Sequence, residues 1–193
     1  METTFHHRSF ALAPGRVFSP RATTERLVDT ALELIGDEAK TVADVGAGSG
    51  VIAVTLAAAN PLLEVWATDT SAAAVELTRE NASRHCVTDR VHAVQGDLLA
   101  PVPIPVDVVV ANLPYLPDSL HDPRYNAEPP DAVYAPGDGL GPYQRLLNAC
   151  REGKLVSPGG LVVIQFHRKV LAADCWQLED LRTDLEKRSL AAA

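Results

Sequence analysis

The sequence predicts an α/β fold in which a mostly parallel sheet has helices on both faces. Short runs rich in β-branched residues alternate with segments of helical periodicity, which is typical of βαβ units with right-handed crossovers. Several runs are almost continuously apolar, as expected for strands that are covered on both sides. A glycine-rich turn follows the first run and leads into a helical segment. That position is where open parallel sheets bind ligands.

The strands and helices are expected in strict alternation. Residues 23–35 predict the first helix, because an apolar stripe recurs there at helical spacing, with Thr23 or Thr24 as the N-cap and Gly36 as the stop. The stripe consists of Leu27, Val28, Ala31, Leu32 and Ile35. The other expected helices are 49–59, 71–84 and 141–152, and the expected strands are 41–45, 64–68, 91–95, 106–111 and 161–166.

The two ends and one long connection complete the organisation. The chain is predicted to be one globular unit, with a substrate-side segment over 1–22 and the main domain over 23–193. Residues 116–141 are rich in Pro, Asp and Gly, and a loop of this length inside a compact domain is often functional. Residues 168–188 look helical, and no strand pattern follows them.

Composition and charge exclude several classes of protein. The 193 residues carry a net charge of −8 without a basic run, which disfavours nucleic acid as a partner. Charged or polar residues interrupt every hydrophobic stretch, so no membrane span is expected, and the N-terminus has no signal-peptide pattern, so the cytoplasm is the expected location. Cys86, Cys150 and Cys175 fit no metal-ligand spacing, so no metal is expected and the thiols should be reduced, in or near the core.

A glycine turn ends the first strand. Asp44 precedes Gly46, Ala47, Gly48 and Gly50, and glycines at alternate positions let the backbone turn sharply against a ligand. A dinucleotide fingerprint would need its third glycine where this chain has Val51, which argues against a nicotinamide enzyme.

Two further acids follow the next two strands. Asp69, with Thr70 after it, is placed to accept hydrogen bonds from ribose hydroxyls. Asp97 can accept from an adenine amino group, while the Leu98 N–H faces a ring nitrogen. Three acids at the ends of three consecutive strands therefore predict a site for an adenosine-containing ligand.

The fourth strand ends in Asn112-Leu113-Pro114-Tyr115, which resembles the Asn-Pro-Pro-Tyr motif of methyltransferases that modify planar nitrogens. The Asn112 side-chain oxygen and the Leu113 carbonyl could hold the two N–H groups of an amide and aim its lone pair. Tyr115 could stack on the planar group, and Pro114 stiffens the turn.

With these residues placed, the chain resembles the release-factor glutamine methyltransferases. The resemblance runs from about Phe10 to Val163, and it includes a Pro20-Arg21 segment, Glu128 and the segment 137–140. It implies a Rossmann-like class I methyltransferase fold, S-adenosyl-L-methionine as the cofactor, and a small hairpin before the first helix. Asp44 and the glycine turn would then position the methionine end of that cofactor, and Asn112 would also contact it. The resemblance also implies that Pro20, Arg21 and Glu128 lie on the substrate side.

The chain also departs from that family. Leu113 replaces the first proline of the motif, Thr23 stands where a glutamate is usual, and 162–167 lacks the usual Glu-x-Gly. The helical N-terminal domain of the bacterial enzymes and the last two strands of the sheet have no counterpart. The open sheet edge then needs cover from the last helix, a second copy of the chain or a small activating partner.

The sequence leaves the methyl acceptor open. The preferred prediction is an N-methyltransferase acting on a glutamine side-chain amide of a protein such as a release factor. The alternatives are a small-molecule N-methyltransferase, an RNA or DNA base amino-methyltransferase, and a non-catalytic homologue that binds only the cofactor or a partner.

Overall fold

A computed structural model describes residues 1–38, 40–152 and 155–166 of the chain. The N-terminal part contains β1 (Glu2–Phe5), β2 (Arg8–Ala11), α1 (Ala22–Ile35), β3 (Lys40–Val45), α2 (Val51–Ala59), β4 (Leu63–Asp69) and α3 (Ala72–Arg84). It is followed by β5 (Val91–Gln95), β6 (Val106–Ala111), β7 (Leu116–Pro117), β8 (Tyr134–Ala135), α4 (Gly141–Glu152) and β9 (Val156–Ile164). The expected helix at 168–188 and the question of further strands lie outside the described residues.

The main sheet has five strands in the order β5-β4-β3-β6-β9, and every neighbouring pair is parallel. The predicted α/β fold is therefore confirmed, and the predicted bounds of β5 and β6 agree with the structure. β3 lies at the centre, with Val45 in register with Thr68 of β4 and Ala111 of β6. The segments that follow these three strands consequently emerge at one edge of the sheet.

The last described strand begins earlier than predicted. β9 starts at Val156 rather than at 161 and ends at Ile164. Its register against β6 shifts, so that Val106 pairs with Val156 while Val108 already pairs with Leu161. This irregularity accommodates a Ser-Pro-Gly-Gly run that breaks the apolar pattern, and such residues are typical of bulges.

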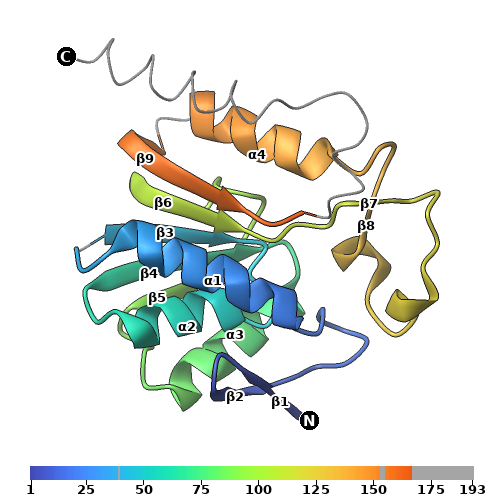
Figure 1. Ribbon diagram of the computed structural model, residues 1–193, viewed down its shortest axis with the longest axis horizontal. Helices are drawn as coiled ribbons and strands as arrows, with labels where there is room; N and C mark the ends of the chain where they lie inside the picture. The colour runs from blue at the N-terminus through green and yellow to red at the C-terminus, as the bar shows by residue number, and fades with distance from the viewer. Residues whose placement is uncertain (39, 153–154, 167–193) are drawn as a thin grey trace.

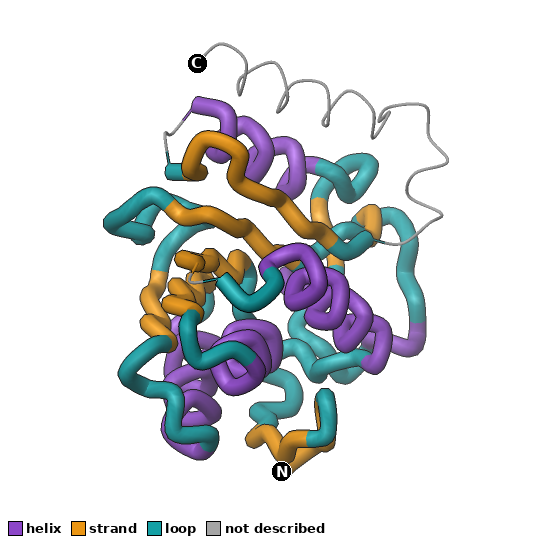
Figure 2. Tube along the Cα trace, turned by 60° about the vertical axis from the view of Figure 1, so that its left-hand side comes forward, coloured by secondary structure: helices purple, strands orange, loops and turns teal. Residues whose placement is uncertain are grey.

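Helices cover both faces of the sheet, as predicted. One apolar core joins α1, α2 and the end of α3 to one face, and a second core joins Tyr143 and Leu146 of α4 to the other face. Figure 1 shows α4 beside β6 and β9, and Figure 2 shows the strands between α4 and the other helices. Strand side chains alternate between these faces, which places Val42 in the first core and Ala43 in the second.

The outer edge of β9 has no strand partner within the described part of the chain. The prediction that a helix, a second copy or a small partner covers this edge stays a prediction. No helix in the described ranges is long and apolar enough to cross a membrane.

The N-terminal hairpin of β1 and β2 packs into the main core. Phe5 and Phe10 are buried among residues of α1 and α2, and their rings meet edge to face with centroids 6.0 Å apart. Asn81 of α3 is fully buried and joins the hairpin through both its amide oxygen, which accepts from Ala11 N at 2.8 Å, and its amide nitrogen, which donates to Ala11 O at 3.2 Å.

Two local predictions were wrong. The N-cap of α1 is Arg21 rather than Thr23 or Thr24, and Thr24 lies inside the helix, where it is buried. Cys86 is exposed just after α3, in a left-handed turn with φ 56°, whereas the thiols were expected near the core. Cys150 does fit that expectation, because it is half-buried and free and its burial raises the pKa of the thiol to about 11. Cys175 lies outside the described residues.

Candidate active site

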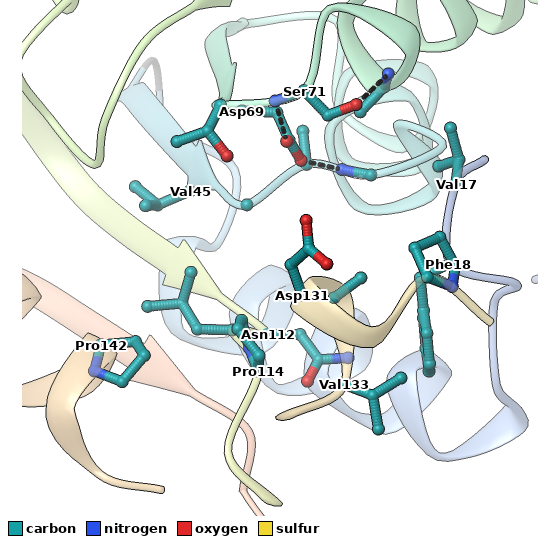
Figure 3. Close-up of a pocket in the computed structure, with 18 of the residues that line it drawn as sticks. Val17, Phe18, Val45, Asp69, Ser71, Asn112, Pro114, Asp131, Val133 and Pro142 are labelled. Atoms are coloured by element: carbon teal, nitrogen blue, oxygen red, sulfur yellow. Dashed lines mark hydrogen bonds between the residues drawn. The ribbon is translucent and has the colours of Figure 1, made fainter. Parts of the chain in front are cut away.

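A cavity of about 360 Å³ lies where β3, β4 and β6 end, and its volume is within the range typical of small-molecule sites. The N-terminal segment, the long loop after β6 and the start of α4 complete its walls. Most of the predicted site residues line it: Pro20, Arg21, Gly46, Ala47, Gly48, Asp69, Thr70, Asp97, Leu98, Asn112, Leu113, Pro114 and Tyr115. The structure thus brings together residues from five separate segments, and Figure 3 shows several of them around the cavity.

Backbone hydrogen bonds hold the glycine turn against β4. Gly46 N and Ala47 N both donate to Thr68 O, at 2.8 and 3.0 Å. Gly50 lies behind the turn and does not line the cavity, and a Cβ there would come within 3.0 Å of the Thr78 backbone. Gly50, with φ 77°, therefore serves the close approach of α2 and α3 rather than direct contact with a ligand.

Asp44 does not reach the cavity, although it was predicted to position the methionine end of the cofactor. It precedes the last residue of β3, and strand alternation turns its side chain toward α2, where it is 0% exposed. Its Oδ2 accepts from Ala53 N at 3.0 Å, and its Oδ1 has no partner among the described residues. Burial raises the pKa of this carboxyl to about 7. Any influence of Asp44 on the ligand would therefore pass through the turn and the start of α2.

The two acids expected to bind adenosine do line the cavity, but both already have protein partners. Asp69 accepts from Gly48 N and Ser71 N, each at 2.9 Å, so it fixes the glycine turn to the start of α3. Asp97 is exposed and forms an ion pair with Arg145 of α4. The assignment of ribose to Asp69 and adenine to Asp97 stays a prediction.

Asn112 is oriented by a helix that is distant in sequence. Its Nδ2 donates to Thr24 Oγ1 at 3.2 Å, and the half-buried side chain lies on the cavity wall. This hydrogen bond leaves the Asn112 side-chain oxygen without a partner among the described residues, which is the arrangement that an amide acceptor requires.

Leu113 connects the acceptor motif with the glycine turn. Its side chain fills the space in front of Gly46, since a Cβ on Gly46 would lie 2.8 Å from Leu113 Cδ2. Its N–H donates to the Tyr143 hydroxyl at 3.1 Å, and that hydroxyl also lies 3.1 Å from the Leu113 carbonyl and contacts the Gln165 carbonyl. Tyr143 is buried, which raises the pKa of its phenol.

A clamp joins the N-terminal segment to the long loop. The Arg21 guanidinium lies near the rings of both Phe18 and Tyr125, at 5.2 and 5.3 Å from their centroids. Glu128 accepts from Arg21 Nη2 and from Ser19 N, both at 2.9 Å, and its side chain is only 7% exposed. The predicted substrate-side residues Arg21 and Glu128 therefore meet, although Glu128 holds the wall of the cavity without lining it.

Sequence reasoning missed several residues that position the site. Thr24 orients Asn112, Tyr143 holds Leu113, and Asn81 donates to Ser49 O at 2.8 Å behind the glycine turn. Each acts on a segment far away in the chain, so no local motif marks it. Gln165 lines the cavity just after β9, and its Oε1 is buried without a partner in the part of the chain that the structure describes.

Solved structures show which fold the chain has. The fold matches the ribosomal protein L11 methylase of Lactobacillus delbrueckii subsp. bulgaricus with a TM-score of 0.55 and 22% identity, covering 92% of this chain and 74% of that one. It also matches the precorrin 8w decarboxylase of Methanobacterium thermoautotrophicum with a TM-score of 0.56 and 24% identity, covering 86% and 74%. The fold is the Rossmann-like fold of S-adenosylmethionine-dependent methyltransferases.

The chain belongs to the methyltransferase small domain family, which matches residues 16–124. The cofactor that this family implies is S-adenosyl-L-methionine. Three relatives bear the name release factor glutamine methyltransferase. The Moorella thermoacetica protein is 39% identical, and the match covers 83% of this chain and 58% of that protein. The Deinococcus radiodurans protein is 40% identical, with 90% of this chain and 65% of that protein covered. The Gloeobacter violaceus protein is 34% identical, with 84% of this chain and 58% of that protein covered. The chain thus spans 58 to 65% of the length of these relatives.

Proposed function

We propose that this chain is an S-adenosylmethionine-dependent N-methyltransferase that acts on a planar nitrogen, the glutamine side-chain amide of a protein such as a peptide release factor. The observation that carries the proposal is Asn112, which is tied to Thr24 through its nitrogen and is left with a free oxygen on the cavity wall. The names of the relatives favour a glutamine acceptor over other planar nitrogens.

The amide chemistry explains why such a site is needed. An amide nitrogen is a poor nucleophile because its lone pair is delocalised over the carbonyl. Two acceptors that each hold one N–H, the Asn112 side-chain oxygen and the Leu113 carbonyl, would fix the plane of the amide and aim its lone pair. No general base is needed before attack, because the nitrogen loses its proton readily once it has formed the new bond.

The residues present fit the cofactor. When bound, S-adenosylmethionine supplies an electrophilic methyl group on a positively charged sulfur. At Gly48 the glycine turn offers a backbone surface open to a ligand, because only the Val17 side chain lies near the missing Cβ, at 4.0 Å. Asp69 and Thr70 would meet the ribose, and Asp97 with Leu98 would meet the adenine. Pro114 and Tyr115 would bound the acceptor side, where burial raises the pKa of the Tyr115 phenol and keeps it neutral.

The test measures methyl transfer to intact release factor by mass spectrometry, in parallel with a free glutamine amide and a short RNA. We expect transfer to a glutamine of the protein. N112A should lower kcat at least 100-fold and change the affinity for S-adenosylhomocysteine less than twofold, because it removes the acceptor contact and the hydrogen bond to Thr24 that orients it. N148A, on the exposed face of α4, is the matched control and should keep full activity.

Other outcomes would contradict the proposal in different ways. Equal transfer by N112A would remove the two-acceptor mechanism. Preferential transfer to the free amide or to RNA would replace the protein acceptor with a metabolite or a nucleic acid. Calorimetric failure of S-adenosylmethionine to bind would overturn the enzymatic function as a whole.

A further inference from the structure

The carboxylates that line the cavity differ in what they already bind. Asp69 accepts two backbone N–H groups, and Asp97 is paired with Arg145. Asp131, in the short 3-10 turn Pro130–Ala132, also lines the cavity, and no hydrogen bond or ion pair engages it within the described residues. Asp131 is exposed, so its carboxylate can meet either solvent or a cationic ligand group in the cavity.

Asp131 points toward the region where the cofactor is expected. In Figure 3 its carboxylate projects from the long loop into the space between Asp69 and Asn112. Asp44 was predicted to position the methionine end of the cofactor, but it is buried beneath α2 and does not line the cavity. The α-ammonium group of the ligand therefore has no acidic partner from β3, and Asp131 is the cavity-lining carboxylate that has no protein partner among the described residues.

The backbone of the loop is anchored on both sides of Asp131. Three residues earlier, Glu128 is clamped by Arg21 and Ser19. Two residues later, Val133 is buried, and its carbonyl accepts from Leu116 N at 3.2 Å. Because the backbone is anchored on both sides of Asp131, the loop itself loses little conformational freedom when the carboxylate meets a ligand.

We propose that Asp131 binds the α-ammonium group of S-adenosylmethionine. This inference rests on the S-adenosylmethionine site of the proposed function and not on the identity of the methyl acceptor. It makes the long loop part of the cofactor site. Binding of the cofactor and seating of the loop on the N-terminal segment then stabilise each other, because Asp131 and Glu128 belong to the same short stretch.

The experiment compares three ligands that share adenosine, with calorimetry on the full chain. S-adenosylmethionine carries both the sulfonium and the ammonium, S-adenosylhomocysteine carries only the ammonium, and 5′-methylthioadenosine carries neither. D131N should weaken binding of the first two about tenfold, as expected for loss of a charge-assisted hydrogen bond, and leave methylthioadenosine within twofold. D131E should recover part of the lost affinity. D118N, which removes an exposed carboxylate from the same loop outside the cavity, is the matched control.

Each other result overturns the assignment. A loss confined to S-adenosylmethionine would place Asp131 on the sulfonium. An equal loss for all three ligands would indicate disruption of the loop. Unchanged affinities with a raised KM for the methyl acceptor would place Asp131 on the acceptor instead. A wild-type chain that binds none of the three would overturn the proposed function itself, which is a distinct outcome from the failure of D131N to change affinity.

Discussion

Replacing Asp44 by Asn tests how the buried acid affects stability. Burial raises its pKa from 3.8 to about 7, and Asn is nearly isosteric and can still accept from Ala53 N. An acid whose pKa is raised by folding contributes stability fully below its unfolded pKa, and this contribution is lost as the pH rises through the folded pKa. Since each pKa unit corresponds to about 1.4 kcal/mol, the ionised Asp44 costs the native state up to about 4 kcal/mol at pH 8.

The assay is urea unfolding of the ligand-free chain at pH 5 and pH 8, with stability taken from midpoints at unchanged m values. Most of the destabilisation of the native state by ionised Asp44 develops between pH 5 and pH 8. The free energy of unfolding of D44N relative to wild type should therefore rise by roughly 2–3 kcal/mol over this range. D118N, an exposed carboxylate variant, should show no such trend. A stability difference between D44N and wild type that does not vary with pH would refute the claim that burial governs this carboxyl.

Three further variants probe the supports of the site. G139A should destabilise the chain by about 1–3 kcal/mol in urea unfolding, because Gly139 has φ 86° and a Cβ would lie 2.2 Å from Tyr115 O; wild-type stability would contradict that close approach. E128Q should raise the KM for the methyl acceptor about threefold to tenfold by weakening the clamp on Arg21, and an unchanged KM would count against a substrate-side role. N81A should lower the free energy of unfolding, measured by thermal unfolding, by about 2–4 kcal/mol, because it leaves three buried backbone groups without a partner. A loss below 1 kcal/mol would contradict this explanation.

Periodicity and turn residues were sufficient for most of the fold. The strands at 91–95 and 106–111 match the structure because turn-forming residues bound their apolar runs clearly. The start of β9 was missed because Pro158 and the two glycines after it look like a turn, whereas the structure absorbs them in a register shift against β6. The sequence of one strand shows its apolar pattern, but it does not show which neighbouring strand accommodates a shift in register.

The site could be predicted where the order of the strands along the chain determines which residues lie together. Residues that follow parallel strands meet at one edge of the sheet, which is why Asp69, Asp97 and Asn112 surround one cavity. Asp44 is the exception, because strand alternation points its side chain into the core and it does not line the cavity. Thr24 could not be identified from sequence, because its role depends on a hydrogen bond to Asn112 across 88 positions.

The contact between Leu113 and Tyr143 has a consequence for the leucine that replaces the family's proline. A phenol has one proton to give, and its oxygen can accept in return. Because Leu113 has an N–H, it can satisfy the accepting side of the Tyr143 hydroxyl, while the proton of that hydroxyl can go to the Gln165 carbonyl. The Leu113 carbonyl then keeps both lone pairs for an incoming amide. A proline here would stiffen the turn, but it has no N–H to donate to the Tyr143 hydroxyl. Leucine makes the turn less rigid and links the acceptor motif to the end of β9 through that hydroxyl.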